Sequence, residues 1–99
     1  MDIKLRYMSN DDVQVSTFLP CQIALPRSQQ LEWPGIVVTW SVDSATKQPG
    51  YFVVTHCSLD ELGSAITMLA DFVAALKERC DNFAELVETL RSYITSEVQ

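Results

Sequence analysis

The sequence has one histidine, three isolated glycines and no pair of cysteines separated by two residues. Zinc sites and disulfide frameworks use closely spaced cysteines and histidines, so the scattered Cys21, Cys57 and Cys80 predict free thiols. The isolated glycines leave no glycine-rich loop that could bind a phosphate. We therefore expect neither a metal nor a cofactor in this chain.

Long apolar runs are also missing. The most apolar window, residues 65–76, is interrupted by Asp71 and is shorter than the roughly 18–20 residues that a membrane span needs. Residues 1–4 are not followed by the apolar stretch of a signal peptide. These features predict a soluble cytoplasmic protein that does not contact a membrane.

Basic residues are few, and the formal net charge is −6. The charge is uneven, because residues 58–99 carry eight acids and three bases whereas residues 1–57 carry five and four. An acidic surface gains nothing from counterion release on nucleic acid, so we expect no direct nucleic-acid binding. A partner with a basic surface, or mimicry of nucleic acid, stays open.

The apolar content of 47% is enough for the core of one domain that spans residues 1–99. The first half alternates with period two at residues 3–7, where Ile3, Leu5 and Tyr7 would face a core. Further strands are predicted at 13–19, 36–42 and 51–56, the last two as a hairpin. Residues 21–25 lie between two prolines, which favours an edge strand or an extended crossing. The expected fold is α+β, with an antiparallel sheet of three to four strands in residues 1–57.

A helical region is expected over residues 58–97, packed on one face of the sheet. Ser58 and Glu61 have the spacing of a capping box, in which each side chain bonds the other residue's backbone amide. Cys57 and Leu62 stand at the positions of a hydrophobic staple. The sequence therefore predicts a helix that begins at Ser58.

The helical region carries one unbroken apolar heptad row, which we call the seam. Its spacing alternates between three and four residues through Leu59, Leu62, Ile66, Leu69, Val73, Leu76, Cys80, Phe83, Val87, Leu90 and Ile94. β-Branched residues at a and leucines at d are typical of two-stranded parallel coiled coils. The flanking positions offer no opposite-charge pairs, and over residues 59–76 a broad apolar stripe favours packing on the sheet.

The second half of the seam needs a surface that the sheet cannot supply. A continuous helix to about residue 96 would be about 55–60 Å long, whereas strands of six or seven residues span roughly 20–24 Å. The helix could break near residues 80–82, where Asn82 and Glu85 form a second capping-box pattern, and fold back as a helix pair. We favour one continuous helix whose second half forms a homodimer through Phe83, Leu86, Val87, Leu90, Tyr93 and Ile94.

His56 and Cys57 suggest thiol chemistry, because a helix N-terminus depresses a thiol pKa and a histidine can act as a base. Adjacent strand residues point to opposite faces, which favours a packed Cys57 and a solvent-facing His56. We therefore assign no catalytic residue. A small thiol-dependent enzyme or redox sensor that uses Cys57 is the alternative function.

The main functional prediction is a non-catalytic inhibitor, adaptor or chaperone that docks on a larger protein. The small size and acidity also suggest a phage or mobile-element origin. The residues assigned to partner binding form an acidic ridge opposite the seam, with one aromatic anchor: Asp71, Glu78, Asp81, Glu85, Glu88 and Trp33. A nucleic-acid mimic and a structural subunit of an assembly are further alternatives.

Overall fold

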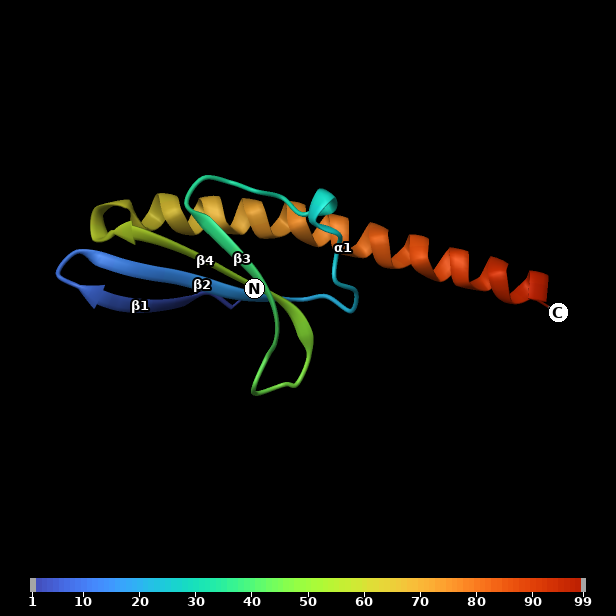
Figure 1. Ribbon diagram of the computed structural model, residues 1–99. Coiled ribbons are helices and arrows are strands. Elements are labelled where there is room, and N and C mark those ends of the chain that lie inside the picture. The colour runs from blue at the N-terminus through green and yellow to red at the C-terminus, as the bar shows by residue number, and fades with distance from the viewer. Residues whose placement is uncertain (1, 99) are drawn as a thin grey trace.

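The computed structural model describes residues 2–98 of the chain, and side chains over residues 2–93. A four-stranded antiparallel sheet is followed by one long helix that packs against it (Figure 1). The elements in chain order are β1 (Lys4–Ser9), β2 (Asp12–Pro20), β3 (Ile36–Val42), β4 (Pro49–Ser58) and α1 (Leu62–Val98). Short 3-10 turns span Arg27–Gln29 and Leu59–Glu61. The predicted α+β class is confirmed.

The strand order in the sheet is β1-β2-β4-β3, so β2 and β4 are central and β1 and β3 form the two edges. Val15 lies opposite Thr55 in the central pair, and Val38 lies opposite Val53 in the predicted β3–β4 hairpin. Directly opposed residues of antiparallel strands share a face. One face of β2 and β4 therefore combines mostly apolar residues: Val13, Val15, Leu19, Tyr51 and Val53.

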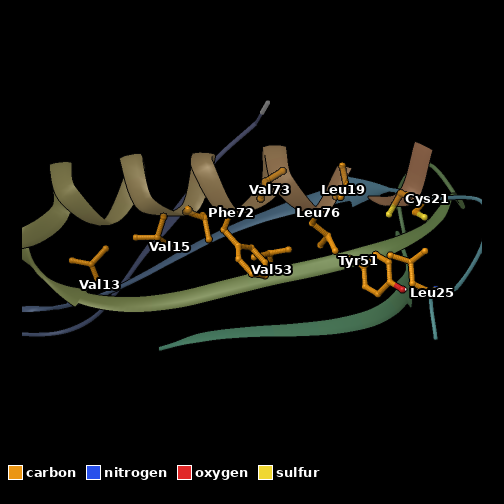
Figure 2. Packing of buried hydrophobic residues seen from close by; sticks show 12 residues of the cluster. Val13, Val15, Leu19, Cys21, Leu25, Tyr51, Val53, Phe72, Val73 and Leu76 are labelled. Atoms are coloured by element: carbon orange, nitrogen blue, oxygen red, sulfur yellow. Dashed lines mark hydrogen bonds between the residues drawn. The ribbon is translucent and has the colours of Figure 1, made fainter. Parts of the chain in front are cut away.

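The core lies between this face and the first half of α1 (Figure 2). Leu69, Phe72 and Leu76 are fully buried, and they recur at the three- and four-residue spacing of one helix face. The segment after β2 crosses beside them as extended chain rather than as a strand, with Cys21 and Leu25 buried. The prediction of an extended crossing is therefore correct for residues 21–25, and the edge-strand alternative is wrong.

The predicted start of the helical region is confirmed in position, because Ser58 is the N-cap of the 3-10 turn that leads into α1, but the predicted capping box is wrong. Ser58 is the last residue of β4, its backbone is extended, and its side chain makes no capping hydrogen bond. The neighbouring strand binds the first N–H of the turn, because Ser58 lies opposite Asp12 and the Leu59 N–H donates to the Asp11 carbonyl at 3.1 Å. The α-helix begins only at Leu62, after a 3-10 turn.

Leu5 and Tyr7 were predicted to face a core, but they are not buried in it. Their register partners, Val15 and Val13, place them on the helix side of the sheet, yet both side chains are exposed. The reason is the position of α1, which contacts β2 and β4 and leaves most of β1 uncovered. Ile3 alone among the three packs partly against the core.

The helix is continuous. It runs for 37 residues without a break at 80–83, so the helix-pair alternative is wrong. At 1.5 Å per residue this length is about 55 Å, and Figure 1 shows α1 passing well beyond the end of the sheet. Within residues 2–98, no stretch of helix is both long and apolar enough to cross a bilayer.

Candidate protein-docking site

The seam of α1 divides into a buried half and an exposed half. Cys80 is the last fully buried residue of the helix, and Phe83 packs partly against the core. Beyond it, Leu86, Leu90 and Tyr93 are 54%, 51% and 63% exposed. We call Leu86, Val87, Leu90 and Tyr93 the tail stripe.

The sheet ends where the tail stripe begins. The crossing segment brings Cys21 against the last buried turn of α1, where Cys21 and Cys80 both belong to the core. Leu31 lies beside Arg79 and Asn82 in a small hollow of about 260 Å³, and also packs against the core. Among the described residues 2–93, Leu86, Leu90 and Tyr93 remain exposed beyond this point. Of the predicted interface residues, Phe83 belongs partly to the core, and the side chain of Ile94 is outside the described residues.

The acidic residues assigned to partner binding are all exposed: Asp71, Glu78, Asp81, Glu85 and Glu88. Their heptad positions place them on the side of α1 opposite the seam. Asp81, Glu85 and Glu88 lie along the same stretch of helix as the tail stripe, whereas Asp71 is more than two turns nearer the N-terminus. The structure thus places part of the predicted ridge on the same turns of α1 as the tail stripe, but on the opposite side of the helix.

Trp33 does not join this site. Its ring packs edge-on against Phe72, with centroids 5.5 Å apart, and the side chain is about one-third exposed. It lines a shallow hollow of about 450 Å³ with Thr67, Met68 and Asp71 on the first half of the helix. Trp33 covers the edge of the core. The helix residues beside it belong to the first half of α1, whereas the tail stripe belongs to the second half.

The geometry around Cys57 does not provide an activated thiolate. Burial raises the pKa of Cys57, and the nearby carboxylates of Glu61 and Asp12 raise it further. The depressed pKa considered from the sequence is therefore wrong. Cys57 lies opposite Val13 and packs against the core, while His56 lies opposite Gln14 and is exposed. In residues 2–98 no hydrogen bond joins His56 to Cys57.

The cysteines have free thiols, as predicted. Cys21 and Cys80 are buried next to each other, and the Cys21 thiol also donates to the Ile23 carbonyl at 3.0 Å. Within residues 2–98, no three histidine, cysteine or carboxylate side chains come together as metal ligands.

The sequence reasoning missed a hollow on the sheet face that α1 leaves open. It has a volume of about 560 Å³, and Phe18 and Phe52 are among its lining residues. Lys4 lines it from the β1 edge of the sheet, and Asp43 lines it from the β3 edge. Phe18 and Phe52 are directly opposed in register. The alternation of residues in β2 and β4 places both phenylalanines on this face. Asp43 is held within its own turn, because its carboxylate accepts hydrogen bonds from the Thr46 N–H and hydroxyl.

Comparison with family models, with curated proteins and with solved structures gives no match to this chain.

Proposed function

We propose that this chain is a non-catalytic binding protein that docks on another protein through the tail stripe. The observation that carries the proposal is the row of exposed apolar side chains on the half of α1 that extends past the sheet. Contiguous exposed apolar surface on a folded domain usually marks an interaction site.

The spacing within the stripe fits one mode of recognition. Leu86, Leu90 and Tyr93 stand at positions i, i+4 and i+7, which are the anchor positions of a helix that binds in an apolar groove. Burying such side chains contributes roughly 25 cal/mol per Å² of apolar area. Three large anchors supply the central apolar part of an interface.

The acidic residues on the opposite side of this half of α1 favour one class of partner. Asp81, Glu85 and Glu88 are exposed along the same helix turns but opposite the stripe, so they would attract a partner with a basic surface without contacting the groove that holds the stripe. Such complementarity mainly increases the association rate and rejects acidic partners. The proposed partner is therefore a larger protein with an apolar groove for the tail stripe and a basic surface that attracts the acidic side of α1.

A second copy of the chain is the alternative occupant, favoured by the unbroken heptad spacing through Phe83, Val87 and Leu90. Two parallel copies would conflict, because the seam that each helix would offer is already packed on its own sheet as far as Phe83. Past Phe83 the helix continues through residues 84–98, a length of about 22 Å at 1.5 Å per residue. A tail-to-tail dimer would therefore have to be antiparallel.

Site-specific photocrosslinking tests the proposal. A photoreactive amino acid replaces Leu86 in the full chain, and in a control it replaces Leu59, an exposed leucine far from the tail. In a lysate of the native host, position 86 should crosslink a protein that position 59 does not, and Leu90→Asp should abolish that adduct. Adducts only between two copies would instead support the antiparallel dimer. Identical adducts at both positions, or none at position 86, would refute docking through the tail.

A further inference from the structure

The two edges of the sheet differ in how they are protected against pairing. β1 carries Lys4 and Arg6, and its register with β2 is interrupted between Tyr7 and Ser9. Charges and bulges are the devices that keep an edge strand from pairing with another chain. β3 has seven residues, Ile36–Val42, with no charge, no proline and an uninterrupted register. The edge at β3 therefore lacks each of these protections.

The backbone of β3 presents hydrogen-bonding groups away from the sheet. The Ile36 N–H donates to the Trp33 carbonyl at 3.1 Å, so it does not face β4. The Asp43 N–H donates to Gln48 across the hairpin, so it faces inward. Because successive residues of an antiparallel strand alternate, Val38, Trp40 and Val42 share the outward phase of Ile36. Their N–H and C=O groups form a template for one more strand.

Two of the residues whose backbone groups point away from β4, Trp40 and Val42, also have partly exposed side chains. Trp40 and Val42 are 38% and 59% exposed on the helix side of the sheet. Trp40 packs edge-on against Tyr51, with ring centroids 5.1 Å apart, so its position is fixed. A strand added at this edge would cover both side chains.

We propose that the outer edge of β3 pairs antiparallel with β3 of a second copy of this chain, forming one continuous sheet across the dimer. In the register centred on Trp40, the two Trp40 residues are directly opposed, and Val38 of each copy lies opposite Val42 of the other. All three outward residues then pair, and the apolar side chains gather on one face, as cross-strand pairing favours. A two-fold interface of this kind is closed.

Charge supports a second copy as the occupant. β3 brings no charged residue to the pairing, and in this register Asp43 lies opposite Val37 of the other copy rather than opposite another acid. Self-pairing at β1 would instead bring Lys4 and Arg6 of both copies to one edge, where like charges are destabilising. The self-complementary apolar alternation of β3 is what an added strand requires.

Backbone amide exchange, measured by NMR on the full chain at low and high concentration, tests this pairing. The Thr39 and Ser41 N–H groups point to β4 and should be protected at every concentration. The Trp40 and Val42 N–H groups should become protected only as dimer forms. Fast exchange of Trp40 and Val42 at concentrations where the chain is dimeric, or a chain that stays monomeric throughout, would overturn the proposal.

A proline variant supplies a second, independent measurement. Val42→Pro removes an outward N–H that β4 does not use, a change that edge strands tolerate. Sedimentation should show wild type at twice the 11.1 kDa chain mass and Val42→Pro at the monomer mass with an unchanged circular dichroism spectrum. Leu90→Asp in the tail should remain dimeric. If Leu90→Asp dissociates the dimer, or Val42→Pro leaves it intact, β3 is not the interface.

Discussion

The Leu25 backbone N–H donates a hydrogen bond of 2.7 Å to the hydroxyl of Tyr51, and both residues are buried. The bond fixes the crossing segment after β2 to the first residues of β4. Tyr51→Phe would leave the Leu25 N–H without a partner, which costs about 1–3 kcal/mol. Urea unfolding should show this loss. Tyr7→Phe, at an exposed tyrosine, should change stability by no more than about 0.5 kcal/mol, and equal effects would contradict the assignment.

Two leucines on the same seam should respond differently to truncation. Leu76 is 0% exposed and Leu90 is 51% exposed. Leu76→Ala removes a fully packed core side chain and should cost about 2–5 kcal/mol. Leu90→Ala should stay within about 0.5 kcal/mol of wild type for the isolated protein. Chemical denaturation at low protein concentration measures both, and a large loss at Leu90 would mean that the tail contributes to the fold.

Stability should fall in alkali because of buried thiols. Burial, followed by the neighbouring Cys21, raises the pKa of Cys80 far above its usual value of 9.0. The folded chain keeps this proton while the unfolded chain loses it, so the stabilising effect is present below pH 9 and is lost as pH rises. The free energy of unfolding should decrease above about pH 9, by up to about 1.4 kcal/mol per pH unit for this group.

Cys80→Ala isolates this contribution, because the variant lacks the titrating group whatever its stability at neutral pH. The measurement is the slope of unfolding free energy against pH between 8 and 10.5, and it should be shallower in the variant. A residual slope is expected, since burial also raises the pKa of Tyr51. Identical slopes in both proteins would show that Cys80 does not carry the effect.

The side chain of Ser58 should be dispensable. It forms no cap, so Ser58→Ala should change the free energy of unfolding by much less than the roughly 1 kcal/mol that an N-cap serine contributes. Thr55→Val is the comparison, because the buried Thr55 hydroxyl donates to the Gly35 carbonyl at 2.8 Å and its loss should cost about 1 kcal/mol. Thermal unfolding of the two variants measures both effects. A larger loss of unfolding free energy in Ser58→Ala than in Thr55→Val would indicate that Ser58 does cap the helix.

The features that the sequence predicted correctly depend on local periodicity. The alternation in residues 36–42 gave the bounds of β3, and the unbroken heptad spacing through Cys80 and Phe83 indicated one continuous helix. Both patterns are fixed by residues close in sequence, so each is readable without knowing where the neighbouring elements lie.

The features that the sequence missed depend on contacts between distant segments. Ser58 and Glu61 have the spacing of a capping box, but the carbonyl of Asp11 takes the Leu59 N–H. The exposure of Tyr7 follows from the path of α1 over β2 and β4 rather than over β1. The outward direction of alternate β3 residues is set by the register with β4, which the Asp43 N–H bond to the Gln48 carbonyl marks.

The most direct measurement is the affinity of wild type and Leu90→Asp for the protein crosslinked through position 86, together with the unfolding midpoint of each chain. Leu90 is half exposed at the centre of the tail stripe, so its replacement by a charge should remove binding energy without altering the core. The prediction is a loss of affinity of at least about tenfold, or about 1.4 kcal/mol, with an unchanged midpoint. Equal affinities, or a fall in stability large enough to explain the loss of affinity, would contradict the account. In that account the first half of α1 stabilises the fold and the second half binds the partner.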